Sequence, residues 1–415
     1  MTPWPNVSYE TLPWVSRAPM SSRARNRQPS EYRSAVPPAI SQVRDVASHL
    51  SPETLALADR ATIAVTRFDV TQAAAVLPFT PLLLRGESVA SSRIEHLTSS
   101  ARKVMEAELL GVSRGNAGLI AAATSQMTEA VQSTGAPTVE SLRTMHRLLL
   151  ESSAPDIAGT YRTDPVWIGG SDAHPVDSLF VPPAPGRVPA LMADLAQFMT
   201  RTDVPTLVLV AVSHAQFETV HPFVDGNGRT GRALMHTLLR HRGVCANGTL
   251  PLAAGLLENT TAYFDALDAY RTGDIDAIVQ LIAHAALRGA DLGLWLGREL
   301  AELRESWQDR VHARKDAADW RVLDDLVRRP VTDVSAVSSE LKLSAVNARK
   351  ALDRLQDDGI LASAQIAKGR RAWRSPEVLE LLDEFAERAG RRGNYTSVDD
   401  RDTEDAADSE DAANG

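Results

Sequence analysis

The decisive stretch of this sequence reads HPFVDGNGRTGR over residues 221–232. It separates two apolar segments long enough to be helices, the first over residues 206–220. Pro222 blocks continuation of that helix. Gly226 and Gly228 allow backbone angles that other residues avoid, and they expose peptide N–H groups. The sequence therefore predicts a buried helix, a glycine-rich turn and a second helix that begins near Gly228.

The start of that second helix is suited to an anion, because free N–H groups and the positive end of the helix dipole meet there. Arg229 and Arg232 share one face and can each bind phosphate oxygens. Asp225 offers a hard oxygen ligand for a Mg²⁺ shared with phosphates. His221 is a candidate general base. With no nucleophilic Ser or Cys in the stretch, the pattern predicts substitution at phosphorus.

The stretch resembles the motif of the Fic (filamentation induced by cyclic AMP) family, His-x-Phe-x-(Asp/Glu)-Gly-Asn-Gly-Arg-x-x-Arg, at every fixed position. The preceding residues 213–218 and the strings at 161–162, 167–170 and 180–183 are similar to the helix and β-hairpin flap of that family. The resemblance spans roughly Phe68 to Leu287. It implies a mainly α fold, a Fic helical bundle with a β-hairpin flap, and an enzyme that moves AMP from ATP to a Ser, Thr or Tyr hydroxyl of a protein.

The resemblance also implies a role for each matched residue. His221 deprotonates the target hydroxyl, and Asp225 holds Mg²⁺ between the α- and β-phosphates. The flap at Ile168 and Gly169 pairs with the target backbone. Tyr263 and Arg271 fall where the family lines its adenine pocket, although ordinary packing explains them equally well. The full set expected to bind ATP is Asp225, Gly226, Asn227, Gly228, Arg229, Thr230, Gly231, Arg232, Ile168, Gly169, Tyr263 and Arg271.

A second string, SSRIEH over residues 91–96, is similar to the inhibitory motif of the family, (Ser/Thr)-x-x-x-Glu-(Gly/Asn). In that motif, which begins here with Ser91, Glu95 pairs with Arg232 and competes with the charge of the substrate. His96 departs from the pattern, so the strength of inhibition stays open. A solvated glutamate on an amphipathic helix is the alternative interpretation of Glu95.

Composition limits the remaining possibilities. The 415 residues suggest two or three domains, and 44% hydrophobic with 23% charged residues is typical of a globular protein. The net charge of −9 argues against a generally basic nucleic-acid binder. The single cysteine, Cys245, excludes an intrachain disulfide. We expect a cytoplasmic chain with no secretory signal, no membrane partner and no apolar run of the roughly 18–20 residues that cross a bilayer. The best strand candidates are residues 163–168 and 178–181, as a hairpin.

The C-terminal part resembles a winged helix-turn-helix module over Trp320–Arg374, with residues 344–355 as its second helix. Residues 320–395 carry 14 Lys/Arg and 12 Asp/Glu, so both DNA binding and protein binding stay open. The predicted division is an N-terminal arm (1–45, ordered only in part), a helical region with the inhibitory helix (46–135), the Fic core (136–290), a connecting helix (291–318), the winged-helix module (319–395) and a disordered acidic tail (396–415).

Several functions remain compatible with these patterns. A Fic enzyme can transfer UMP, GMP or a phosphoryl group instead of AMP. It can also remove AMP, with Glu95 positioning a water. In a different class, the chain is a transcriptional regulator whose Fic domain senses a nucleotide. The target protein is left open, and the chain itself is one candidate. A homodimer through the helices is left open as well.

Overall fold

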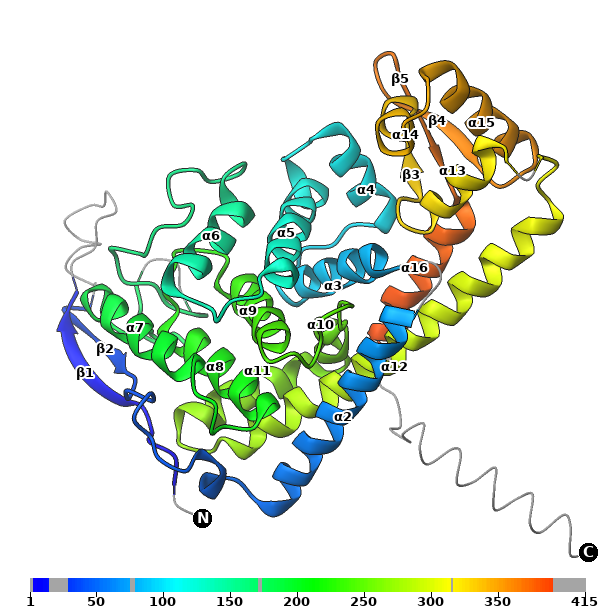
Figure 1. Ribbon diagram of the computed structural model, residues 1–415. Coiled ribbons are helices and arrows are strands. Elements are labelled where there is room, and N and C mark those ends of the chain that lie inside the picture. Colours follow the sequence, from blue (N-terminus) through cyan, green and yellow to red (C-terminus); the bar gives the residue numbers. More distant parts are fainter. Residues whose placement is uncertain (1–2, 15–28, 75–78, 171–173, 315, 391–415) are drawn as a thin grey trace, which may run out of the picture.

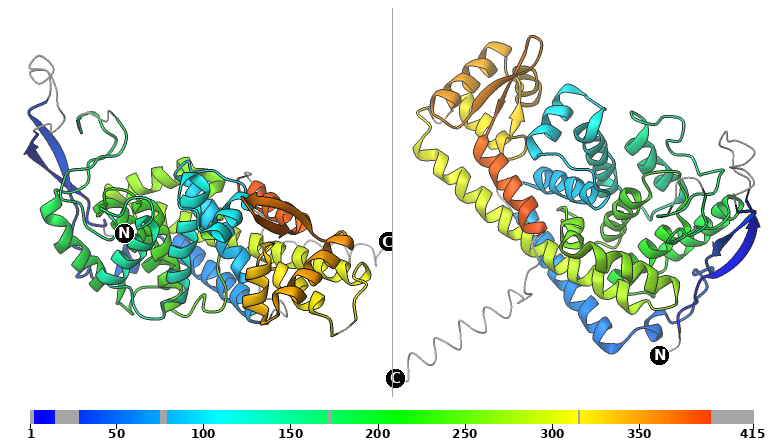
Figure 2. Two further views of the ribbon diagram at one scale, coloured as in Figure 1. Left: turned by 90° about the horizontal axis from the view of Figure 1, so that it is seen from above. Right: turned by 180° about the vertical axis from the view of Figure 1, so that it is seen from behind.

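The computed structural model describes residues 3–14, 29–74, 79–170, 174–314 and 316–390, and these residues are mainly helical. Two long helices, α2 (Pro52–Ala74) and α12 (Asp276–Ser306), run side by side along one face of the molecule (Figures 1 and 2). A Cβ on Gly293 of α12 would lie 2.5 Å from the Phe68 ring of α2, so a glycine is needed there for this close approach. The connecting helix predicted over residues 291–318 overlaps the second half of α12, which ends at Ser306.

The centre of the fold is the helix pair α8 (Thr206–Val220) and α9 (Asn227–His241). Every side chain of α8 from Leu207 to Val220 is buried, which explains why the segment is apolar on most faces. The helices around this pair are α3 (Thr80–Ile94), α4 (Ala101–Leu110), α5 (Gly115–Gln132), α6 (Val139–Leu150), α7 (Val188–Met199), α10 (Leu252–Leu256) and α11 (Thr260–Arg271), with short 3₁₀ helices η1 (Val46–His49), η2 (Pro185–Arg187), η3 (Leu257–Asn259) and η4 (Trp307–Asp309).

The N-terminal segment contains two strands that the sequence analysis missed. β1 (Ser8–Pro13) and β2 (Glu31–Val36) pair antiparallel, with Ser8 opposite Val36. β2 is tied to the core because the Ala35 N–H donates to the Val181 carbonyl at 3.0 Å. Ser34 is buried at a position where an apolar residue would indicate a strand. The alternation of apolar and polar residues typical of a strand is therefore not visible in the sequence of β2. Residues 15–28 of the predicted arm lie outside the described residues.

The predicted hairpin of residues 163–168 and 178–181 was wrong in extent. The structure reduces it to one antiparallel bridge between Ile168 and Phe180. The Ile168 N–H donates to the Phe180 carbonyl at 2.8 Å, and the Leu179 N–H donates back to Ile168 at 2.8 Å. Pro165 removes a donor and two glycines follow Ile168, so neither arm can continue as a strand.

The C-terminal segment, residues 318–390, contains four helices and three strands, of which β4 and β5 form a hairpin that we call the wing. The three strands form a sheet in the order β3-β5-β4. The winged helix-turn-helix module over residues 320–374 stays a prediction. The sequence analysis did not predict the last helix, α16, which returns along α12 and contacts α3 (Figure 1). The elements are α13 (Ala318–Leu326), β3 (Val331–Thr332), α14 (Val334–Leu341), α15 (Ala345–Asp357), β4 (Ala362–Ala367), β5 (Arg370–Arg374) and α16 (Pro376–Ala389). The acidic tail lies outside the described residues.

One helical stretch in the described ranges, Asp276–Asp309, is long and apolar enough to cross a membrane, with a mean hydropathy of 1.2. The sequence analysis expected none. Because 56% of its apolar window is buried, largely against α2 and α10, the stretch also has the properties of a core helix.

Cys245 is buried in the turn after α9, and burial raises the pKa of its thiol to about 12.

Candidate active site

The turn between α8 and α9 is built by backbone angles and one side chain. His221 ends α8 in the left-handed region, with φ 47°, and Gly226 precedes α9 with φ 76°. The Asn227 side chain accepts from the Phe223 N–H and donates to the Phe223 carbonyl, both at 2.9 Å. These two bonds close the turn over four residues, so the predicted helix, turn and helix are present, with α9 beginning at Asn227.

Replacing Asn227 with Ala is expected to lower the free energy of unfolding by about 1–3 kcal/mol, because it leaves both backbone groups of Phe223 without their partner in a buried position. Denaturant unfolding measures this change. Asn347→Ala, at an exposed position of α15, is the control, with an expected change below about 0.5 kcal/mol. Equal effects of the two substitutions would contradict this account of the turn.

A second histidine, His146, packs against the turn and is hydrogen-bonded to it. The His146 ring stacks on Phe223 with 3.7 Å between ring centres. Its Nδ1 accepts from the Gly159 N–H at 2.9 Å, so Nε2 carries the proton and donates to the Asp225 carbonyl at 2.9 Å. Burial lowers the pKa of His146 to about 4, which keeps the ring neutral. The sequence analysis missed this residue, because a histidine on the buried face of α6 gives no signal beyond the helix period.

His221 lies mostly buried at the mouth of the turn. Burial, followed by the positive charges of Arg162 and Arg271, lowers the pKa of its imidazole to about 4. Its Nδ1 lies 3.7 Å from Oε2 of Glu218, and this nitrogen has no hydrogen-bond partner among the described residues. A neutral imidazole of this kind can accept a proton at neutral pH.

Arg162 holds the turn and the flap together. Its Nε donates to the His221 carbonyl at 2.8 Å, and its Nη2 donates to the Pro183 carbonyl at 2.6 Å and to Val220 at 3.2 Å. The sequence analysis placed Arg162 in the flap and gave it no role. Backbone acceptors leave no trace in side-chain composition, so the role became visible only in the fold.

Glu218 is a further buried group that faces α9. Burial raises the pKa of its carboxyl to about 7, and its Oε1 has no partner among the described residues. A Cβ on Gly231 would lie 2.6 Å from Oε1 of Glu218 and 3.1 Å from Nδ1 of His214, so α9 needs a glycine there to approach α8. Gly231 thus allows close packing of α9 on α8, and its contact with ATP stays a prediction. Thr230 is also buried, and its Oγ1 accepts from Gln126 at 2.9 Å.

A cavity of about 440 Å³ opens beside the turn. One wall is apolar, with Leu97, Leu119 and Leu150. Ile168, Gly169, Thr230, Gly231, Arg232, Tyr263 and Arg271 do not line this cavity. The residues that the sequence analysis selected and that the cavity brings together are Glu95, His221, Asp225, Gly226, Asn227, Gly228 and Arg229.

Two arginines carry the positive charge of the site. Arg232 is fully buried and donates from Nε to Ser91 Oγ at 2.8 Å and from Nη2 to the Ser91 carbonyl and to Glu95 Oε1, each at 2.9 Å. Nη2 of Arg229 lies 3.6 Å from Oδ2 of Asp225. Nη1 of both arginines and Nε of Arg229 are buried without a partner in the described part of the chain. Buried guanidinium donors of this kind can bind the oxygens of an anion.

Tyr263 and Arg271 are engaged in packing. The Tyr263 hydroxyl and His214 Nε2 are hydrogen-bonded at 2.8 Å. The Arg271 guanidinium lies 3.7 Å from the centre of the Phe180 ring and pairs with Asp268 at 2.6 Å. The packing alternative accounts for both residues as they stand.

Asp225 fits a Mg²⁺ that is completed by phosphate oxygens. Its side chain is 63% exposed beside the cavity, and its Oδ1 accepts from the Gly226 N–H at 2.6 Å. Mg²⁺ commonly takes one carboxylate together with phosphates and waters. Within the described ranges no cluster of three or more His, Cys, Asp or Glu side chains could hold a metal ion. The donor set therefore suits a metal that arrives with a nucleotide.

This geometry belongs to a class of domain in which a glycine-rich helix start, two arginines and one histidine meet at an anion site. Residues 136–239 match the model of the Fic/DOC family. Among curated proteins, the protein adenylyltransferase Fic of Drosophila erecta is 30% identical over 168 residues, which cover 40% of this chain and 31% of that protein. The protein adenylyltransferase Fic of Aedes aegypti is 31% identical over 167 residues.

The chain thus matches only about a third of the length of these curated relatives. A solved structure of a Fic family protein from Desulfovibrio desulfuricans G20 is similar in fold, with a TM-score of 0.50 and 23% sequence identity. That similarity covers 79% of this chain and 96% of the other. The expected Fic helical fold is confirmed.

Proposed function

We propose that this protein is an adenylyltransferase that moves AMP from ATP to a hydroxyl of a protein. The observation that carries the proposal is the meeting of three features at one cavity: a neutral His221, the free N–H groups that begin α9, and the unpartnered donors of Arg229. The names of the curated relatives support the choice of AMP as the transferred group.

In this mechanism His221 takes the proton of the target hydroxyl, whose oxygen attacks the α-phosphorus of ATP as pyrophosphate leaves. The amides that begin α9, together with Arg229 and Arg232, bind and neutralise the phosphates. Asp225 would hold Mg²⁺, which would supply further neutralisation of phosphate charge. The burial of His221 favours its role, because burial keeps the ring unprotonated before the reaction.

The same site is proposed to be inhibited by Glu95. Its carboxylate reaches Arg232 at 2.9 Å and occupies the space that a Cβ on Gly228 would fill. Burial raises the pKa of Glu95, but the charge of Arg232 and its hydrogen bond outweigh burial and hold that pKa below the ordinary value. The carboxylate therefore stays ionised, and it competes with a phosphate for the same guanidinium.

His96 has a physical part in this inhibition. It follows α3 with φ 60°, in the left-handed region that Gly and Asn adopt more easily than His. We expect His96→Asn to lower basal transfer by up to about fivefold, since relief of about 1 kcal/mol of strain favours the ordered end of α3. His96→Ala is the control because it removes the ring and retains the unfavourable angle. A fall of equal size in both variants would contradict this explanation.

Transfer of label from ATP marked at the α-phosphate tests the proposed function, with the chain itself and lysate proteins as acceptors. We expect little label with the wild type, more with Glu95→Gly, and a return to background when His221→Ala is added. Competition by unlabelled UTP and GTP distinguishes AMP from other nucleotides. Loss of label from a premodified target would instead favour AMP removal. No label in any variant that binds ATP would overturn the proposal.

A regulator that binds DNA through residues 318–390 is less favoured by the geometry. The basic side chains of that segment are largely engaged within the chain: Arg354 reaches Asp319 at 2.7 and 2.5 Å, and Arg349 reaches Asp353 at 2.8 Å. Paired guanidinium groups have less charge to offer phosphates. A sequence-dependent DNA shift at nanomolar protein, without nucleotide transfer, would restore that alternative.

A further inference from the structure

We infer that Arg93 ties the inhibitory helix α3 to α16, so that the C-terminal segment, residues 318–390, controls how firmly Glu95 engages Arg232. The inference rests on the proposed function and adds to it a positioning residue and a source of regulation.

The contact that carries the inference lies two residues before Glu95. Nη1 of Arg93 donates to the carbonyl of Ala386 at 2.7 Å. Ala386 belongs to the last turn of α16, where carbonyl groups lack partners within the helix and the helix dipole is negative. A guanidinium is well suited to such a helix end. The end of α3 that presents Glu95 is therefore held on one side by α16 and on the other by Arg232.

A second contact lies two turns earlier on α3. A Cβ on Gly86 would approach the buried Phe385 ring to 2.9 Å, so the absence of a side chain there allows α16 to pack closely. Arg85 adds a bond from Nη1 to the carbonyl of Arg328 at 3.2 Å. Beyond the inhibitory helix, Arg370 of the wing donates to the carbonyl of Leu109 at 2.8 Å. The C-terminal segment thus contacts the chain both before and after Glu95.

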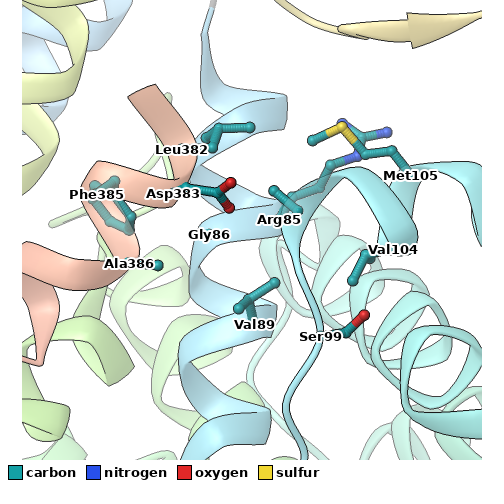
Figure 3. Close-up of a pocket in the computed structure, with 11 residues that line it drawn as sticks. Arg85, Gly86, Val89, Ser99, Val104, Met105, Leu382, Asp383, Phe385 and Ala386 are labelled. Atoms are coloured by element: carbon teal, nitrogen blue, oxygen red, sulfur yellow. The ribbon is translucent and has the colours of Figure 1, made fainter. Parts of the chain in front are cut away.

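The interface between α3 and α16 is incompletely packed. A cavity of about 40 Å³ lies between α3, α4 and α16, where Leu382, Asp383 and Phe385 of α16 and Arg85 and Val89 of α3 line it and Asp383 lies beside Arg85 (Figure 3). Atoms that line such a gap lack the attractive contacts of a filled core. The few polar bonds across this interface therefore matter more for the position of α3 than they would in a tightly packed one.

The middle of α3 is fixed independently. The Glu87 carboxylate, fully buried, lies 2.8 Å from Nε2 of His236 on α9 and accepts from the Ala253 N–H at 2.8 Å. Since Glu87 holds this part of the helix, a displacement of α16 acts on the end that carries Arg93 and Glu95. A partner that binds residues 318–390 and shifts α16 would pull Arg93 and withdraw Glu95 from Arg232. Regulation of transfer would then enter through the C-terminal segment.

Arg93→Ala in the full chain tests the inference, with ATP affinity by calorimetry and label transfer as readouts. We expect both to rise by about fivefold or more when Glu95 is present, and to stay unchanged when Arg93→Ala is added to Glu95→Gly. Arg93→Lys should restore part of the inhibition. Arg102→Ala, which removes a surface pair with Glu106 on α4, is the matched control and should change neither quantity. Equal changes in both Glu95 backgrounds, or none in either, would overturn the inference.

A second variant and a second readout separate this inference from the proposed function. Gly86→Ala pushes on Phe385 with Arg93 intact, and it should change ATP affinity in the same direction. Hydrogen exchange of the amides of residues 88–96 should quicken in Arg93→Ala even if no substrate is labelled. If Glu95→Gly fails to transfer AMP while exchange quickens, the proposed function fails and the tie stands. Unchanged exchange in both variants would remove the tie.

Discussion

Replacing His221 with Ala in a Glu95→Gly background is expected to lower AMP transfer by about 100- to 10,000-fold, the usual range for loss of a general base. Among the described residues no other histidine lines the cavity, so no second imidazole there can take over the proton. Binding of ATP should change little, because the phosphates are held by α9 and its arginines. Calorimetry with ATP and label transfer measure the two effects separately.

The pH dependence of transfer provides a second check on the same residue. Since burial and nearby arginines lower the pKa of His221 to about 4, the ring is a free base at pH 6 and above. Transfer should therefore decline only below the range of an ordinary histidine, whose pKa is about 6.5. His312→Ala, at an exposed histidine paired with Asp358, should leave rate and profile unchanged. A profile that declines at about pH 6.5 would show that burial does not lower the pKa of the base as expected.

Replacing Glu95 with Gly is expected to raise ATP affinity and transfer by about 5- to 150-fold, the span of typical coupling energies between two sites. The carboxylate and a phosphate compete for Nη2 of Arg232, and Gly removes the competitor. Arg232 keeps its two bonds to Ser91, so the buried guanidinium remains in place.

Two further variants separate charge from shape in this inhibition. Glu95→Gln keeps the size of the side chain and loses its charge, so we expect an intermediate rise in ATP affinity. Glu106→Gln, at a surface pair of α4, should have no effect. A Glu95→Gly protein with unchanged ATP affinity would show that the pair with Arg232 does not inhibit binding.

Local patterns predicted much of the helical fold. α8 follows from an apolar run too long for a strand. α14 begins after Asp333, a residue type that favours helix starts, which accepts from the Ala336 N–H at 2.8 Å. The strands were harder to predict, because β2 is held by a hydrogen bond between Ala35 and Val181, which are far apart in the chain. Pairing of this kind is set by the fold and leaves no local period.

The residues of the candidate site likewise fall into those that the sequence predicted and those that it did not. The motif resemblance pointed to His221 and to Glu95 facing Arg232, and the structure brings the last two together at 2.9 Å. It did not point to His146 or Arg162, whose partners are backbone carbonyls. It also placed Tyr263 near the adenine, which stays a prediction; in the structure the Tyr263 hydroxyl is bonded to His214. Residues that act through the main chain are the ones sequence reasoning found least.

The buried thiol of Cys245 makes the chain convenient for site-specific labelling. Its side chain is 5% exposed and burial raises its pKa to about 12, so maleimide reagents should not react with it at neutral pH. A cysteine introduced at exposed Val346 on α15, or at exposed Leu179 beside the flap, would then be the reactive one without removal of the native residue. Fluorophores at such positions could report distance changes in the unaltered protein core as nucleotide binds.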